Sequence, residues 1–358
     1  YLMTNLGIFG AGMIANLHAE AAVRAGSTIS SVFDPVRKKA QAFGKQHGCA
    51  VANDIDEMLQ NNTIDGIVIA VPNDMHAELA IAGLNAKKDV LLEKPMAITT
   101  RECDEIIAAA NSSGSVLQLG FVCRYAPAAI KAKELISLNN IGKVQNVNAT
   151  LIRHRGIPGL GGWFTTKARS GGGCLIDIGV HLIDLVMHIT DVGIPKTATG
   201  ICKQTFSIDN YSYDEMWSDP VKDGVFDVED SVKATVRFED GASLQLDIAW
   251  ATELEEGQWK DGLVIEGETG SLAIDLWGDT IALRQTCDGV DSETMVSIDV
   301  KDAWEEAFQA EHVAFSSAVE TRSLQVNAGS ASDGRNVQLI VDAIYNANSS
   351  NKEVMIAI

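Results

Sequence analysis

The sequence predicts a two-domain protein whose first domain is of the α/β type, and three observations support this. The chain has 358 residues, a length typical of about two domains. Over residues 5–120, short apolar runs alternate with helical patterns, which is typical of a parallel sheet covered by helices on both faces. After residue 122, long runs of period-two alternation indicate strands with one buried face.

The expected elements follow in chain order. The strands of the first domain are five apolar runs, at 6–10, 27–34, 65–71, 89–94 and 115–121. Helical segments are expected between them, at 13–26 and 101–114 among others. The second domain begins with one helix at 127–138, continues as alternating strands, and closes with helices at about 302–320 and 333–348. We therefore expect domains at 1–121 and 122–358.

A glycine motif follows the first expected strand. Gly10, Gly12 and Ala15 form a GxGxxA pattern that opens the next helical segment. In dinucleotide-binding (Rossmann) domains the first glycine permits a tight turn, the second lets the backbone approach a pyrophosphate, and the helix N-terminus attracts that anion. Met13 and Ile14 are then expected beside the cofactor. A glycine-rich turn without a ligand is the alternative, but the strand-to-helix context favours the dinucleotide.

The choice between NAD and NADP is predicted from the end of the second strand. Asp34 stands where a carboxylate accepts hydrogen bonds from the adenosine ribose and repels a 2′-phosphate, which favours NAD. Asp34 is alternatively a helix-capping residue before Pro35. Arg37 and Lys38 follow closely and partly offset the repulsion, so NADP remains the alternative cofactor.

The third and fourth of these strand ends also carry polar groups. Pro72, Asn73 and His76 follow the strand at 65–71, at the edge where ligands bind in such sheets. We assign them to the cofactor site, although Asn73 is also a suitable helix cap and a solvated role is common for a first-turn histidine such as His76.

The segment Glu93-Lys94-Pro95 interrupts the strand end at 89–94. Pro95 restricts the turn that directs Lys94, and we assign Glu93 and Lys94 to the cofactor site as well. An ordinary surface lysine beside a turn is the alternative. A lysine at the carboxyl edge of a cofactor-binding sheet is the stronger functional candidate.

Residues 170–189 are mostly apolar after three glycines, as expected of a buried helix, yet they include Asp177, His181 and Asp184. The i, i+4, i+7 spacing places these three on one face. Because buried charge is costly unless it is partnered, this face is either a satisfied structural network or the lining of a site. A metal site that adds Asp184 or His188 to Asp177 and His181 is also compatible with the spacing.

Together these segments resemble the Gfo/Idh/MocA family of oxidoreductases, over nearly the whole chain. The matching segments are GxGxxA at 10–15, AVPNDMHAE at 70–78, EKP at 93–95, GFVCRY at 120–125, GGGCLIDIGVHLID at 171–184, VEDSVKATVRFEDGA at 228–242 and IEGETGSL at 265–272. The resemblance implies an α/β Rossmann domain plus an α+β domain with a large, open, mostly antiparallel sheet. It also implies that this sheet mediates homodimers or homotetramers.

The resemblance further implies that Lys94, Asp177 and His181 are catalytic and touch the substrate. Oxidising an alcohol with NAD requires a hydride acceptor and a base, and a histidine titrates near neutrality. Asp177 then orients the substrate and the imidazole, while closure of the two domains brings Lys94 to them. There are two rival interpretations. One is the metal site, which gives no role to the EKP segment or to the Rossmann domain, and the other is a non-catalytic NAD or sugar sensor.

Substrate contacts are expected from two further segments. Cys123 replaces the first arginine of the related GFxRR-like segment and Arg124 is kept, so Arg124 either binds substrate or pins the interdomain hinge. The loop at 151–170 mixes aromatic, basic and glycine residues, as a polyol site requires. We expect His154 and Trp163 to contact substrate there, although an ordinary basic loop is the alternative. No role follows from the acidic and aromatic segment 207–230.

The predicted substrate is a neutral sugar, glycoside or cyclitol, and a phosphorylated sugar or sugar acid is the alternative because the cleft could be locally basic. The net charge of −20 argues against nucleic acid and anionic membranes as partners. No apolar run appears long enough to span a bilayer, no metal site is expected, and six cysteines without CxxC or zinc spacing suggest free thiols in the cytoplasm.

Overall fold

A computed structural model of the chain describes residues 4–208, 220–255, 261–287 and 289–357. It divides into two compact units. The first comprises residues 1–125 and 305–335, and the second comprises 126–304 and 336–358. The units differ from the expected domains at 122–125 and at 305–335, because a C-terminal segment packs with the N-terminal half of the chain.

The first unit contains a six-stranded parallel sheet in the order β3-β2-β1-β4-β5-β6. Its strands are β1 (Asn5–Phe9), β2 (Thr28–Phe33), β3 (Ala50–Val51), β4 (Gly66–Ile69), β5 (Asp89–Glu93) and β6 (Leu117–Gly120). This strand order is that of a Rossmann fold. Strands β2 and β3 lie on one side of β1 and strands β4 to β6 on the other, and such folds bind ligands at this switch point between β1 and β4. The five expected strands are confirmed, and the two-residue β3 is an addition.

Helices and 3₁₀ turns connect these strands. They are α1 (Met13–Arg24), α2 (Arg37–His47), α3 (Ile55–Leu59), the 3₁₀ turn η1 (Asn73–Met75), α4 (His76–Asn85) and α5 (Thr100–Ser113). The 3₁₀ turn η2 (Val122–Tyr125) follows β6, and α9 (Ala303–Thr321) comes from the C-terminal part of the chain. Alanines of α1 and Phe315 and Ala318 of α9 pack on Leu6, Ile8 and Leu91 of the sheet. The small alanine side chains of α1 permit close helix–strand approach. Because Phe315 and Ala318 lie in the same hydrophobic core, α9 belongs to this unit.

The second unit contains a nine-stranded sheet in the order β14-β13-β12-β11-β7-β10-β9-β8-β15. Its strands are β7 (Val144–Ile152), β8 (Pro195–Lys203), β9 (Ser231–Phe238), β10 (Ser243–Ala249), β11 (Asp261–Gly267), β12 (Gly270–Ile274), β13 (Thr280–Cys287), β14 (Val290–Ser297) and β15 (Val354–Met355). The β7–β10 pair is parallel, and the other described pairs are antiparallel. The large, mostly antiparallel sheet is thus confirmed.

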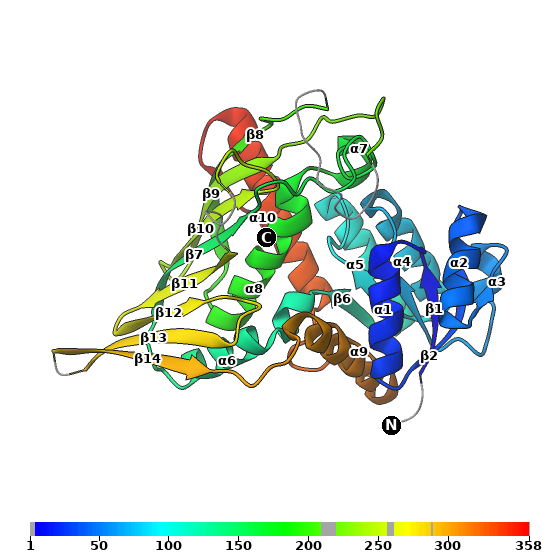
Figure 1. The fold of residues 1–358 in the computed structure, drawn as a ribbon, viewed down its shortest axis with the longest axis horizontal. Coiled ribbons are helices and arrows are strands. Elements are labelled where there is room, and N and C mark those ends of the chain that lie inside the picture. The colour runs from blue at the N-terminus through cyan, green and yellow to red at the C-terminus, as the bar shows by residue number, and fades with distance from the viewer. Residues whose placement is uncertain (1–3, 209–219, 256–260, 288, 358) are drawn as a thin grey trace. The chain divides into compact units, whose positions relative to one another are not determined.

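One face of this sheet is covered by helices and the other is not. The covering elements are α6 (Pro127–Ser137), α8 (Val180–Thr190) and most of α10 (Ala331–Ser350), and in the described part of the unit the opposite face carries no helix (Figure 1). Period-two alternation explains this arrangement. In β9, Val232, Ala234 and Val236 are buried while Lys233 and Arg237 are exposed.

The helical stretch Lys167–Thr190 is long and apolar enough to cross a membrane by length and composition alone, which differs from the expectation for this sequence. In the structure 78% of its 18-residue window is buried. Its composition is therefore accounted for by packing inside the unit, as in the core helix of a folded domain.

Candidate active site

The nucleotide loop of the first unit has the geometry that a dinucleotide needs. Gly10 has a φ of +99°, and a Cβ there would lie 2.1 Å from the carbonyl oxygen of Ala70 at the end of β4. A Cβ on Gly12 would meet nothing within 4 Å, so open space faces this backbone. Helix α1 begins at Met13, and its N-cap residue Gly12 provides no side-chain cap, which leaves the first amides of the helix for an anion. The loop thus fits a bound pyrophosphate. Met13, 41% exposed, follows directly, and the next residue is the half-buried Ile14.

Asp34 joins the ends of β1 and β2. Its Oδ2 accepts a hydrogen bond from the Ala11 amide at 3.0 Å, and its Oδ1 accepts one from the Val36 amide at 2.7 Å. Each carboxylate oxygen can accept a further bond, so the half-buried group remains suited to ribose hydroxyls. Arg37 donates through its guanidinium to the Ala52 carbonyl at 2.8 Å, so part of its hydrogen-bonding capacity is used within the protein.

This geometry predicts that NAD binds more tightly than NADP. We expect a ratio of dissociation constants of about tenfold or more, equivalent to ~1.4 kcal/mol, because Asp34 repels a 2′-phosphate. Isothermal titration calorimetry with both cofactors measures this ratio, and Asp34→Asn should reduce it. Tighter binding of NADP by the unmodified chain would contradict the assignment of Asp34.

The polar residues after β4 hold the loop together. His76 is buried, with its Nδ1 2.7 Å from the carbonyl oxygen of Pro95 and its Nε2 3.0 Å from that of Val71. Burial lowers the pKa of His76, while the two carbonyls act in the opposite direction. The solvated first-turn role is therefore wrong for His76, which links the β4 loop to the EKP turn. Asn73 is buried in η1, next to the half-buried Pro72.

Glu93 contacts the protein interior and its own turn. Its Oε1 lies 2.8 Å from Nε2 of the buried His18, and its Oε2 accepts the Lys94 amide at 3.1 Å. The Lys94–Pro95 peptide bond is cis. His18 in turn contacts Nε2 of His312 through its Nδ1 at 2.9 Å. Glu93, which the sequence suggested as a cofactor contact, is thus positioned to fix the backbone of Lys94.

A second buried carboxyl group, Glu311, adjoins this chain. Ligand-type atoms of His18, Glu93 and Glu311 lie within 4.8 Å of one another. Burial and then the charge of Glu93 raise the pKa of Glu311 well above its ordinary value, and burial lowers that of His312 well below. A proton on Glu311 therefore accounts for two carboxyl groups side by side in the core.

Protonated Glu311 predicts a specific pH dependence of stability. A glutamate titrates at about pH 4.3 in an unfolded chain, so the stability that its raised pKa contributes is complete below that pH and is lost as pH rises through the folded-state pKa. Glu311→Gln should therefore flatten the fall of melting temperature from pH 5 to pH 9. Glu306→Gln, an exposed change on the same helix, is the control. Equal slopes in Glu311→Gln and the unmodified chain would contradict the prediction.

Arg124 is 4% exposed and is engaged within the first unit. It pairs with Asp333 at 3.1 Å, donates to the Ala328 carbonyl at 3.2 Å and lies over the Phe121 ring. Burial raises the pKa of Asp333, but Arg124 and Ser330 lower it by more, so the net pKa is below its ordinary value. These contacts favour a structural pin over a substrate contact for Arg124.

Asp177 lies in a π-turn, the segment η3 (Leu175–Gly179), that directly precedes α8. π-turns inside helices are rare and frequently occur at functional sites. Asp177 and His181 are the half-buried residues of an otherwise buried stretch, 172–186. The turn follows i→i+5 geometry, so the simple i, i+4 face expected from the sequence is interrupted here.

The other polar residues of this helix have structural surroundings. Asp184 is 1% exposed, so it is a core residue and does not lie at a rim. His188 Nε2 lies 3.0 Å from Nζ of Lys133 in α6. These surroundings argue against a metal site in which Asp184 or His188 joins Asp177 and His181. They favour a site formed by Asp177 and His181 without these two residues.

Trp250 is a neighbour of Asp177 that was not predicted from the sequence. Its indole Nε1–H donates to Oδ2 of Asp177 at 2.8 Å, and its side chain is fully buried. It follows directly after β10, so an aromatic residue at a strand end was the one available sequence signal. The bond fixes one oxygen of Asp177.

The expected substrate loop lies beside the end of β10. His154 is half-buried and its Nδ1 donates to the Leu254 carbonyl at 2.7 Å, which leaves Nε2 as an acceptor in the neutral ring. Trp163 stacks on Phe164, with ring centroids 3.8 Å apart, so one face of the indole is already covered. Of the segment 207–230, residues 209–219 lie outside the described part of the chain.

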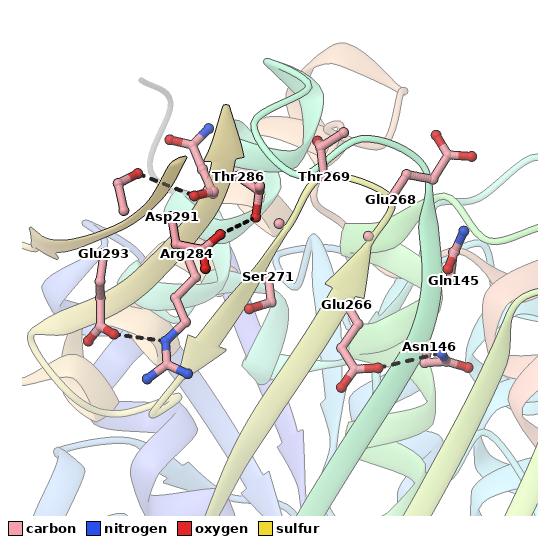
Figure 2. A pocket seen from close by; sticks show the side chains of 14 residues that line it. Gln145, Asn146, Glu266, Glu268, Thr269, Ser271, Arg284, Thr286, Asp291 and Glu293 are labelled. Carbon is pink, nitrogen blue, oxygen red and sulfur yellow. Dashed lines mark hydrogen bonds and ion pairs between the residues drawn. The ribbon is translucent and has the colours of Figure 1, made fainter. Parts of the chain in front are cut away.

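A hollow on the uncovered face of the sheet is distinct from these residues. It is lined by polar side chains of β7, β11, β12, β13 and β14. Figure 2 shows Arg284 paired with Glu293, Thr286 with Asp291, and Glu266 with Asn146. It contains none of the predicted catalytic residues, and we do not assign it to the reaction.

A six-stranded Rossmann sheet, an uncapped glycine loop and a carboxylate at the end of β2 define an NAD-binding protein. Two family models match the chain: "Oxidoreductase family, NAD-binding Rossmann fold" at residues 4–121 and "GFO/IDH/MocA C-terminal domain" at 129–273. The chain belongs to the Gfo/Idh/MocA family of oxidoreductases.

Known proteins resemble this chain in sequence or in structure. A protein of Amycolatopsis mediterranei, named as a UDP-kanosamine synthase oxidoreductase subunit, is 32% identical over 66% of this chain and 64% of its own length, a little under two thirds. D-glucoside 3-dehydrogenase of Escherichia coli is 29% identical over 70% of this chain and 71% of its own. A levoglucosan dehydrogenase solved with NADH and levoglucosan has a TM-score of 0.86 at 22% identity, covering 99% and 100% of the two chains, which shows a common fold.

Proposed function

We propose that this chain is an NAD-dependent dehydrogenase that acts on a hydroxyl group of a sugar, glycoside or cyclitol. The observation that carries the proposal is the placement of Asp177 in a π-turn and of His181 just after it, both half-buried in the otherwise buried stretch 172–186. The family supplies the class of reaction, and the names of the glucoside and levoglucosan dehydrogenases support the class of substrate.

In this proposal the chain's own residues manage the proton. His181 accepts the proton of the substrate hydroxyl as general base. Asp177, with one oxygen held by Trp250, directs its other oxygen to the substrate or imidazole. Lys94 donates a hydrogen bond to the reacting oxygen and stabilises its developing negative charge. NAD, when bound at the Gly10–Gly12 loop, supplies the hydride-accepting chemistry.

A neutral substrate is favoured over a phosphorylated or carboxylated one. Arg155, one of the basic residues in the loop, donates to the carbonyl of His154 at 2.9 Å and pairs with Glu253 at 3.1 Å. Burial raises the pKa of the Asp261 carboxyl, and the positive charge of Arg153 nearby acts in the opposite direction. These two cations are therefore already balanced, while the acceptor Nε2 of His154 suits a hydroxyl group.

A screen that follows NADH absorbance tests the function. The substrates are inositols, aldoses, glucosides, anhydrosugars and their phosphates at one pH, and we expect turnover of neutral rings. Turnover confined to phosphorylated or carboxylated compounds would refute the neutral-ring proposal. Turnover confined to aliphatic alcohols or amino acids would refute the polyol proposal, and NAD binding without any turnover would indicate a sensor.

We further propose a cytoplasmic homodimer or homotetramer, assembled through the uncovered face of the nine-stranded sheet. Five described cysteines are free thiols, which suits a reducing compartment. Charged pairs such as Lys233 with Asp247 lie on that face, as expected of a polar interface. The net charge of −20 supports neither nucleic acid nor an anionic membrane as a partner. Light scattering after gel filtration measures the assembly, and a monomer at micromolar concentration would contradict it.

A further inference from the structure

The π-turn that carries Asp177 needs support from outside its own helix. Irregular helical turns persist where surrounding structure fixes them. Two contacts in the second unit provide such support, one at the start of the turn and one at Asp177 itself. Both lead back to the dipeptide Glu229-Asp230, which is buried directly before β9.

Glu229 satisfies the amides at the start of the turn. Its Oε1 and Oε2 each lie 3.0 Å from the Gly173 amide, Oε1 accepts the Leu175 amide at 3.1 Å, and its backbone carbonyl accepts the Cys174 amide at 3.1 Å. Three successive amides therefore bond to one residue. A carboxylate at this end of a helical segment satisfies donors that have no partner within the helix.

Tyr345 of α10 completes this cap. Its hydroxyl donates to Oε1 of Glu229 at 2.8 Å. The approach is so close that a Cβ on Gly172 would lie 2.0 Å from the Tyr345 hydroxyl oxygen, and a Cβ on Gly173 would lie 1.8 Å from the Glu229 carbonyl oxygen. At these two positions the glycine run is thus explained by contact with Glu229 and Tyr345. Direct approach to a ligand is not required.

Asp230 extends the support to Asp177. Its carbonyl accepts the backbone amide of Trp250 at 2.8 Å, and the Trp250 indole donates to Asp177 at 2.8 Å. The Asp230 carboxylate is itself fixed by the Thr205 and Phe206 amides at 2.6 and 2.7 Å. The dipeptide Glu229-Asp230 therefore fixes both the start of the π-turn and the tryptophan that bonds to Asp177.

We propose that Glu229 and Trp250 are positioning residues for Asp177: Glu229 fixes the π-turn and Trp250 orients the carboxylate toward the substrate. This inference rests on the proposed function for its kinetic consequence. Neither residue touches the reacting atoms in the proposal; each acts through Asp177.

The kinetic test removes single hydrogen-bonding groups. Trp250→Phe deletes the indole donor and should lower kcat roughly 10- to 100-fold, because small misplacements of reacting groups are costly. Affinity for NAD should be unchanged, since the nucleotide loop belongs to the other unit. Trp277→Phe, in a pair with Trp304 remote from the helix in sequence, is the matched control and should retain wild-type kcat.

A double-mutant cycle shows whether Trp250 acts through Asp177. In an Asp177→Asn background, Trp250→Phe should lower kcat by less than about twofold, because the group that it orients is already lost. An equal fold-loss in both backgrounds, or no loss in the unmodified chain, would overturn the positioning role of Trp250.

Glu229 is tested by Glu229→Gln and Tyr345→Phe. Glutamine replaces one acceptor oxygen with a donor that faces backbone amides, so kcat should fall about tenfold or more while the circular dichroism spectrum is retained. Tyr345→Phe keeps all amide contacts and should show a smaller loss. A lower melting temperature with unchanged kcat in Glu229→Gln would show a purely structural role and overturn the proposal for Glu229.

A measurement independent of turnover separates this inference from the proposed function. The indole N–H resonance of Trp250, assigned by its absence in Trp250→Phe, should shift upfield and exchange faster in Asp177→Ala. It should also shift in Glu229→Gln, where the turn is loosened. Absence of turnover with these shifts present would refute the function alone, whereas unchanged resonances in both variants would overturn the positioning network.

Discussion

Replacing His181 with alanine is expected to lower kcat by roughly 10²- to 10⁴-fold, the usual contribution of a positioned general base. His181 is half-buried at the second position of α8, directly after the π-turn that holds Asp177. Removing its imidazole deletes the group that accepts the hydroxyl proton in the proposed reaction. Initial rates of NADH formation on a substrate identified in the screen measure the loss.

NAD affinity separates loss of the base from loss of the fold. The glycine loop and Asp34 belong to the first unit, so His181→Ala should bind NAD as the unmodified chain does. His188→Ala is the matched control on the same helix, because His188 contacts Lys133 of α6 and has no part in the proposed reaction. Wild-type turnover in His181→Ala would show that the assignment of the base is wrong. A comparable loss in His188→Ala would point instead to disruption of the helix.

Local sequence patterns were sufficient for the elements that depend on neighbours in the chain. The GxGxxA motif needs a strand before it and a helix after it, and all three are contiguous from Asn5 to Arg24. Period-two alternation in β9 and β10 likewise follows from one buried and one exposed face. These features follow from the backbone geometry of single segments, so they can be predicted without knowledge of tertiary contacts.

The partners of the site residues could not be predicted in this way. Trp250 is 73 positions from Asp177, and Glu229 is 56 positions from Gly173. Such pairs are set by strand order and register, which a single sequence does not reveal. The π-turn is also invisible to spacing, because an i, i+4 pattern assumes a regular helix.

Polar residues at strand ends proved ambiguous for a physical reason. A buried polar group requires hydrogen-bond partners whether or not it serves a ligand. His76 satisfies this requirement with two backbone carbonyls, and Arg124 does so with Asp333 and Ala328. The same residue types at the same edge of a sheet therefore serve the scaffold as readily as the site, and only their contacts distinguish the two roles.

Replacing Gly12 with alanine is expected to weaken NAD binding about tenfold or more, equivalent to ~1.4 kcal/mol, with little change in stability. A Cβ at this position meets no protein atom within 4 Å, so the folded chain accommodates it. The open space is where the backbone of a Rossmann loop approaches a pyrophosphate, and a methyl group there keeps the two apart. Calorimetry with NAD and thermal melting without it measure the two effects separately.

Gly10→Ala is expected to do the reverse, with a loss of stability of about 2 kcal/mol or more, because the new Cβ would lie 2.1 Å from the Ala70 carbonyl oxygen at a φ of +99°. Gly114→Ala controls for the backbone conformation alone, since Gly114 has a φ of +69° and a Cβ there meets nothing within 4 Å. It should cost about 1 kcal/mol and leave NAD affinity unchanged. Normal NAD binding by Gly12→Ala would place the pyrophosphate elsewhere. Equal stability of Gly10→Ala and Gly114→Ala would show that contact with the end of β4 does not constrain the loop. It would contradict the conclusion that this close contact shapes the turn for a nucleotide.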